Sequence, residues 1–220
     1  MSEIKGIPAV SFDRSAVELL QEETLYRGFF TIKQYQFRHR LFAGGWSDVV
    51  RREMFERGHA VVVLPYLAAT QQVVLIEQIR LGALPTSNTP WLLEAVAGMF
   101  GPDEQPEQVA RREAQEEAGL TLGRLWPMLS YLSSPGGTTE RIHLYLGEVC
   151  GAVTEGLHGL VEEHEDIRVH LVSLSDAVQL LNAGKIDNAA TVIALQWLQL
   201  HQKDVQARWG GGEIQATCCG

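Results

Sequence analysis

The sequence has few cysteines, fewer basic than acidic residues, and no long apolar run. Its three cysteines, Cys150, Cys218 and Cys219, lack the C-x-x-C spacing of zinc ligands, so we expect thiols without a role in chemistry. The 27 acidic residues outnumber 18 basic ones, giving a net charge of −9. Because nucleic acid backbones are bound by basic surfaces, this balance argues against a nucleic acid partner, although it allows a small anionic substrate neutralised by cations.

Signals for membranes or export are also scarce. No stretch of about 18 consecutive apolar residues is present, which argues against a membrane-spanning helix. The initial segment MSEIKGIPAV lacks the basic start, apolar centre and cleavage site of a signal peptide, so a cytoplasmic location is expected. With 45% hydrophobic and 20% charged residues, the 220-residue chain is suited to a folded domain with a smaller appendage.

The apolar pattern predicts how the chain is organised. Residues 17–57 are rich in β-branched and aromatic side chains, which predicts a small antiparallel sheet in an N-terminal domain over 1–57. A main domain is expected over 58–209, and a glycine-rich flexible tail over 210–220. Strands of the main domain are predicted at 60–67, 71–80, 91–98, 125–132, 141–149 and 167–174.

Helical periodicity appears between these strands. It predicts a helix over 105–118, with Pro106 in its first turn and Gly119 capping its end. Ser175 is expected to cap a second, short helix, and a last helix is expected over 189–202, opened by Asp187 or Asn188. Strands and helices mixed in this way favour a layered α/β domain.

The segment GMFGPDEQPEQVARREAQEEAGL, from Gly98 to Leu120, holds the residues most suited to chemistry. On a helix Glu113, Glu116 and Glu117 are three and four residues apart, so their carboxylates share one face and can converge on hard cations. The small residues Ala110, Ala114 and Ala118 form an adjacent stripe that allows close packing on a sheet.

A solvated acidic helix face is the plain alternative for these glutamates. Three further residues at fixed distances, Gly98, Glu104 and Gly119, favour a functional motif instead, and the segment is similar to the Nudix box. The matching positions are Gly98, Glu104, Arg112, Glu113, Ala114, Glu116, Glu117, Gly119 and Leu120. The resemblance implies a Nudix fold, which is an α/β/α sandwich with a mixed sheet, here preceded by the small N-terminal antiparallel sheet.

The same resemblance implies a metal site. Glu113 and Glu117 resemble metal ligands, with Glu116 close by as an expected catalytic residue. An Arg112 to Glu104 pair would leave the carbonyl of Ala97 free as a further ligand. Mg²⁺ is the expected ion and Mn²⁺ a possible substitute, because carboxylate and carbonyl oxygens suit both.

Segments outside the box resemble the bacterial ADP-ribose pyrophosphatases. They are ETLYRGFF, VRREMFERGHA, VVLIEQIR, PWLLEAVAGM, SPGGTTER and EEHEDIRVH. In that family a proline about fifteen residues after the box accompanies ADP-ribose specificity, and Pro135 follows Gly119 by sixteen. The resemblance therefore implies hydrolysis of ADP-ribose to AMP and ribose 5-phosphate.

Carried over by position, Glu163 resembles the general base and Glu165 a further metal ligand, with Glu162 a neighbour that could be mistaken for the base. An ordinary exposed acidic loop is the alternative. The residues that resemble substrate contacts are Phe29, Phe30, Arg52, Glu53, Arg57, Arg80, Met99, Ser134, Pro135, Gly136 and Glu140. The arginines suit phosphate oxygens and the phenylalanines suit stacking on adenine. In the plain reading Arg80 makes a surface salt bridge and the phenylalanines belong to the core.

The family also implies a homodimer in which the N-terminal sheet of one chain helps build the site of the other. Two further functions stay open. The same chemistry could act on another diphosphate, such as GDP-mannose or NADH. A non-catalytic ADP-ribose sensor is the other alternative, which the intact box and the lack of a DNA-binding extension disfavour.

Overall fold

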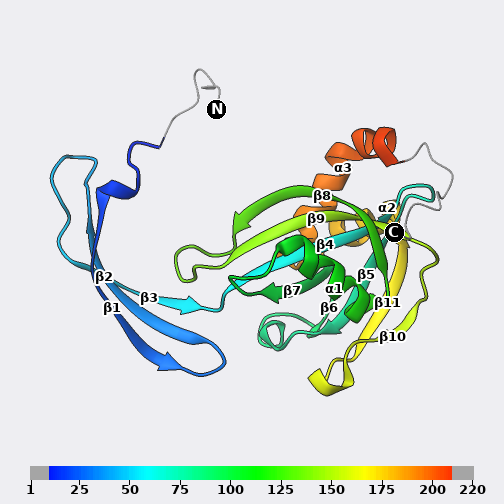
Figure 1. Ribbon diagram of the computed structural model, residues 1–220, viewed down its shortest axis with the longest axis horizontal. Coiled ribbons are helices and arrows are strands. Elements are labelled where there is room, and N and C mark those ends of the chain that lie inside the picture. Colours follow the sequence, from blue (N-terminus) through cyan, green and yellow to red (C-terminus); the bar gives the residue numbers. More distant parts are fainter. Residues whose placement is uncertain (1–9, 210–220) are drawn as a thin grey trace. The chain divides into compact units, whose positions relative to one another are not determined.

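The computed structural model describes residues 10–209, which divide into two compact units (Figure 1). The first consists of the described residues up to Arg57 together with Ser133–Glu140, and the second of the remaining described residues. The loop Ser133–Glu140, which the sequence pattern assigned to the main domain, therefore belongs to the first unit. The expected tail over 210–220, with Cys218 and Cys219, lies outside the described residues.

The first unit is a three-stranded antiparallel sheet. Its strands β1 (Val17–Arg27), β2 (Thr31–His39) and β3 (Val50–Glu56) pair in that order, after a short 3-10 helix, η1 (Arg14–Ala16). The amide of Phe55 donates to Gly137 O at 2.8 Å, and Thr138 Oγ1 donates to Phe55 O at 2.7 Å, which attaches the loop to β3. None of the residues in these three strands is buried within the described chain.

The second unit is built on a mixed sheet. Its strands are β4 (His59–Leu67), β5 (Gln72–Ile79), β6 (Trp91–Glu94), β7 (Val96–Phe100), β8 (Thr121–Leu132), β9 (Arg141–Cys150), β10 (Gly156–His158) and β11 (Ile167–Ser173). They follow the order β10-β11-β5-β4-β9-β8, with β6 on β5 and β7 on β4. The pair β4–β9 is parallel and the other strand pairs are antiparallel.

Helices cover both faces of this sheet, as expected for an α/β/α sandwich (Figure 1). Helix α1 (Pro106–Ala118) packs on one face, and α2 (Leu174–Asn182) and α3 (Ala189–Trp209) pack on the other. Alternation along β4 explains the two layers, because Val61 and Val63 belong to the core under α1, whereas Leu64 and Tyr66 belong to the core under α3. Two short 3-10 helices, η2 (Leu81–Ala83) and η3 (Val161–Glu163), lie in connecting loops.

Several predicted boundaries were wrong. The expected strand over 91–98 is two strands, because the chain leaves β5 at Glu94 and joins β4 from Val96 onward. Helix α2 begins two residues earlier than expected, because Ser173 and not Ser175 is its cap, accepting from the amide of Asp176. The three-residue strand β10 was not predicted because it is too short to show alternation.

Helix ends were predicted better where a cap determines them. Gly119 ends α1 in the left-handed conformation, with φ of 63°. Asn188 opens α3, because its Oδ1 accepts from the amide of Thr191 at 3.2 Å. The helix continues past the expected end at residue 202 to Trp209, which is buried, so packing extends it.

The structure bears on two further predictions, those for the thiol of Cys150 and for membrane-spanning helices. Cys150, the last residue of β9, is disulfide-bonded, so the expectation of a free thiol was wrong there. No helix within residues 10–209 is both long enough and apolar enough to cross a membrane.

Candidate active site

Helix α1 is fixed on the sheet by its small residues. Ala110 and Ala114 are fully buried and Ala118 is 1% exposed, so the predicted stripe is the packing surface of the helix. Side chains of this size allow the helix backbone to lie close to the sheet, and the carboxylates one position away are then held at its edge.

Glu117 is the most buried carboxylate of the helix, at 3% exposure. The amide of Ala97, in β7, donates to Glu117 Oε2 at 3.0 Å. Burial raises the pKa of Glu117 to about 8, the hydrogen bond from Ala97 opposes this rise, and the charge of Glu113 adds to it. The structure therefore brings Glu117 and Ala97, two of the predicted metal ligands, into contact.

Glu113 lies on Gly98. A Cβ atom added at Gly98 would stand well inside van der Waals contact with the Glu113 carboxyl group, so only glycine leaves room for it there. Burial, with the charges of Glu116, Glu165 and Glu163, raises the pKa of Glu113 to about 7, while Arg112 acts in the opposite direction. Two neighbouring carboxyl groups with raised pKa values show that negative charge is unfavourable at this edge of the sheet.

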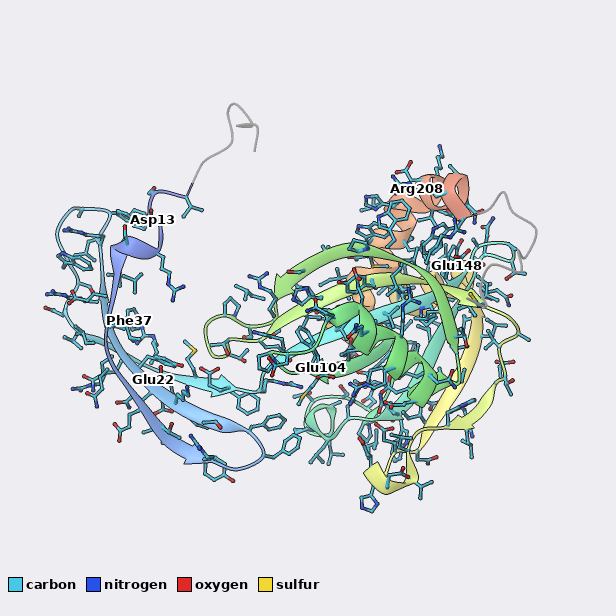
Figure 2. The ribbon with its side chains drawn as sticks, viewed as in Figure 1. Asp13, Glu22, Phe37, Glu104, Glu148 and Arg208 are labelled. Atoms are coloured by element: carbon cyan, nitrogen blue, oxygen red, sulfur yellow. The ribbon has the colours of Figure 1, made fainter. Side chains whose placement is uncertain are left out.

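Arg112 connects the helix to the loop before it. Its guanidinium lies 2.9 Å from Glu113 Oε1, 3.8 Å from Glu104 Oε1 and 4.0 Å from Glu116 Oε2. Glu104 also accepts a 2.9 Å hydrogen bond from the amide of Gly101, which fixes the loop that leads into α1 (Figure 2). The predicted pair of Arg112 and Glu104 is therefore present, as a long ion pair at a half-exposed position.

The charges of the acidic loop after β10 affect the pKa values of these carboxylates. Glu163 and Glu165 both contribute to the raised pKa of Glu113, and Glu165 also contributes to that of Glu117. Glu165 Oε2 accepts from the amide of Leu160 at 3.1 Å, which closes the loop on itself.

Arg80 meets a buried partner. Its Nε donates to Glu94 Oε2 at 2.7 Å, and Glu94 is only 3% exposed, so the salt bridge that the plain reading placed on the surface is partly internal. Arg80 also lowers the pKa of Glu117, which brings its charge near α1. Met99, in β7, is 42% exposed. Sequence reasoning missed Glu94, although a lone acid inside the apolar run WLLEAVAG was a usable signal.

The other predicted substrate contacts lie in the first unit. Arg57 Nε stands 3.1 Å from Glu140 Oε1, and Glu140 is 6% exposed. The Arg57 guanidinium lies 5.5 Å from the centre of the Phe30 ring, which itself packs on Phe55. Phe29 is 87% exposed, so it is not a core residue. The remaining members are exposed: Arg52, Glu53, Ser134, Pro135 and Gly136.

The chemistry of the donor set suits a hard divalent cation. In the described part of the chain, no three His, Cys, Asp or Glu side chains already form a metal-ligand cluster. The carboxylates at hand are nevertheless oxygen donors in a partly buried setting where like charges raise each other's pKa. A divalent cation bound among these carboxylates would remove that repulsion, so the residues present fit such a cation.

Comparisons with known proteins agree with this arrangement. The sequence model of the NUDIX domain matches residues 56–196. An ADP-ribose pyrophosphatase of Escherichia coli K12 is 58% identical over 200 residues, which cover 91% of this chain and 96% of that protein. A GDP-mannose pyrophosphatase of Pectobacterium atrosepticum is 34% identical over 185 residues, covering 83% and 93%. A solved structure of an ADP compounds hydrolase matches with a TM-score of 0.67 and 21% identity, covering 88% of this chain and 98% of that one, which supports the fold.

Proposed function

The chain belongs to the Nudix family, and we propose that it hydrolyses the pyrophosphate bond of ADP-ribose to AMP and ribose 5-phosphate. The observation that carries this proposal is the 58% identity to an ADP-ribose pyrophosphatase over nearly the whole chain, including the loop Ser133–Glu140. The buried carboxylates of α1 support a hydrolytic role, because they offer a cation site beside which a diphosphate can be neutralised.

A divalent cation is part of the proposal, since Nudix hydrolases generally need one. Glu113, Glu117, Glu165 and the carbonyl of Ala97 would hold it, and we propose Mg²⁺, with Mn²⁺ as a substitute. When bound, the cation offsets the charge of the phosphates and lowers the pKa of a nearby water. The 2.9 Å contact with Arg112 uses only Oε1 of Glu113, so Oε2 would be available to the cation.

We assign the general base to Glu163. Its charge reaches Glu113, as the raised pKa of Glu113 indicates, and η3 carries it on a loop that Glu165 closes. A base must come within about 3 Å of the water whose proton it accepts, so the position of this loop matters to the rate. Glu116 lies 4.0 Å from Arg112 at the same helix edge, and we propose that it supports the metal ligands.

The substrate contacts are proposed in two groups. Arg80, near α1, and the backbone of Met99 would meet the diphosphate. In the first unit, Phe29 and Phe30 would stack on adenine, and Arg52, Glu53 and Arg57 would meet phosphate and ribose. The terminal ribose would meet the loop residues Ser134, Pro135, Gly136 and Glu140. Support comes from the exposed ring of Phe29 and from the pairing of the buried Glu140 with the partly exposed Arg57.

We further propose a homodimer in which two chains share each site. The first unit supports this, because a three-stranded sheet without one buried strand residue is marginal by itself. Its exposed apolar side chains include Leu19, Leu20 and Tyr26. Light scattering at micromolar concentration should give twice the mass of the chain, and a monomer mass would contradict the dimer.

The substrate is tested by measuring product release from ADP-ribose, GDP-mannose and NADH with Mg²⁺. GDP-mannose is the second candidate because of the 34% identical relative, and the greater identity to the ADP-ribose enzyme predicts that ADP-ribose gives the highest kcat/KM. The adjacent variants Glu163→Gln and Glu162→Gln form a matched pair for the base, of which only the first should lose about a hundredfold or more in kcat. No turnover of any substrate would leave ligand binding as the remaining reading.

A further inference from the structure

A buried carboxylate outside the box holds Arg80, the charge of which lowers the pKa of Glu117 on α1. Glu94, at the end of β6, uses both of its oxygens: Oε2 accepts from Arg80 Nε at 2.7 Å, and Oε1 accepts from Asn188 Nδ2 at 2.8 Å. Because Glu94 is 3% exposed, water cannot take the place of either donor easily.

The network continues into the first turn of α3. Asn188 Oδ1 accepts from both the amide and the hydroxyl of Thr191, each at 3.2 Å. The fully buried Thr191 hydroxyl in turn accepts from the amide of Ala95 at 2.9 Å. The chain of hydrogen bonds therefore starts at Arg80 and returns to the junction of β6 and β7, two residues before Ala97.

A second buried side chain acts on the same carboxylate. Gln78, on β5, is 7% exposed, and its side chain lies close enough to Glu94 to lower the pKa of that carboxyl group, although its Nε2 makes no hydrogen bond of good geometry with residues 10–209. Burial raises the pKa of Glu94, while Arg80 and Gln78 act in the opposite direction. Polar groups thus converge on Glu94 from β5 and from the start of α3.

This arrangement leaves the two terminal nitrogens of the Arg80 guanidinium available to a ligand. Nε alone binds Glu94, and a guanidinium carries its other donors on two terminal nitrogens, which are suited to paired phosphate oxygens. The Arg80 side chain is 42% exposed even though its partner is buried. An arginine held at Nε has lost the freedom of a long side chain before the substrate arrives, which is the condition for precise positioning.

We propose that Glu94, itself held by Asn188, is a positioning residue that orients the Arg80 guanidinium toward the diphosphate of the substrate. The inference rests on the proposed function, because it assigns the oriented arginine to a diphosphate. Glu94 does not touch the substrate and acts through Arg80. Asn188 links the start of α3 to the same arginine, so the cap of a helix on one face of the sheet contributes to substrate binding near the other.

A double-mutant cycle on purified full-length protein tests this role. Arg80→Ala and Glu94→Gln are made singly and together, and kcat/KM for ADP-ribose is measured with Mg²⁺. Each single change should cost about tenfold or more, and adding Glu94→Gln to Arg80→Ala should cost less than about twofold further, because coupled residues are not additive. Additive losses, or an unimpaired Glu94→Gln or Arg80→Ala, overturn the proposal. Wild-type protein without activity overturns the proposed function itself.

Two variants separate positioning from folding. Asn188→Asp keeps an oxygen to cap α3 but places a carboxylate against Glu94, so kcat/KM should fall at least about fivefold with the thermal midpoint within a few degrees of wild type. If Glu94→Gln does not fold, the cycle is run with Asn188→Asp and judged in the same way. Glu77→Gln is the matched control, because Glu77 lies on β5 and pairs with His170 at 2.9 Å rather than with Arg80, and its activity should be unchanged.

Discussion

The Glu113 carboxyl group lies where a side chain at Gly98 would be, and it fits there because glycine has no Cβ atom. The fourteen positions between them include a loop and half of a helix, yet the two residues are in contact because β7 and α1 pack together. Packing against Glu113 therefore explains why the first residue of the box is glycine, and both residues of this contact belong to the motif.

Replacing Gly98 by alanine should displace the Glu113 carboxyl group. Since the added Cβ would stand inside van der Waals distance of that group, we expect kcat with Mg²⁺ to fall about a hundredfold. Gly101→Ala is the matched control, because a Cβ there would meet only Glu104 Oε2, at the ordinary distance of 3.8 Å. Steady-state kinetics of both variants check the prediction, and equal activity of the two would contradict it.

Glu117→Gln should lower kcat with Mg²⁺ at least about a hundredfold, which corresponds to some 3 kcal/mol of barrier stabilisation. The amide can still accept the hydrogen bond from Ala97, so the fold should be kept while a proposed metal ligand loses its charge. Glu107→Gln, in the exposed first turn of α1, should have normal activity. An active Glu117→Gln enzyme would remove the role of α1 in metal binding.

The metal-free protein should lose stability as the pH rises. Glu113 and Glu117 have pKa values of about 7 and about 8 in the folded chain and an ordinary value of 4.5. The folded state therefore binds more protons than the unfolded state across this interval, and the free energy of unfolding falls from about pH 4.5 to about pH 8.

Thermal unfolding in a chelator, followed by circular dichroism at about pH 5 and about pH 8.5, measures this effect. The midpoint should be lower at the higher pH, Mg²⁺ should restore it mainly there, and Glu117→Gln should reduce the difference. A midpoint that rises with pH in the chelator would mean that the two carboxylates are not the dominant titrating groups.

Gly119→Ala should destabilise the protein with little effect on chemistry. Gly119 has φ of 63°, and an added Cβ would stand 3.0 Å from the ring of His158. The expected cost is about 1 kcal/mol, or about 3 °C in the thermal midpoint for a chain of this size. Gly82→Ala, where a Cβ meets open space and φ is unremarkable, provides the control. A midpoint equal to wild type would show that the cap adapts at no cost.

Local patterns in the sequence were sufficient for much of the fold. The period of alanines along α1 predicted its buried stripe, and Gly119 predicted the helix end, because both depend on residues within a few turns of one helix. The split of 91–98 into two strands could not be read in this way. It depends on which neighbouring strand each half pairs with, and β4 and β5 are both far from it in sequence.

The sequence by itself determined the family, the box and the set of carboxylates, because fixed spacing along one helix places glutamates on one face whatever surrounds them. Only the tertiary structure decided their electrostatic state and their partners. The pKa values of Glu113 and Glu117 depend on burial against β7, and the contact of Arg80 with Glu94 and Asn188 joins residues up to 108 positions apart. Desolvation and long-range hydrogen bonds are properties of packing, so they arise only when the strands and helices come together.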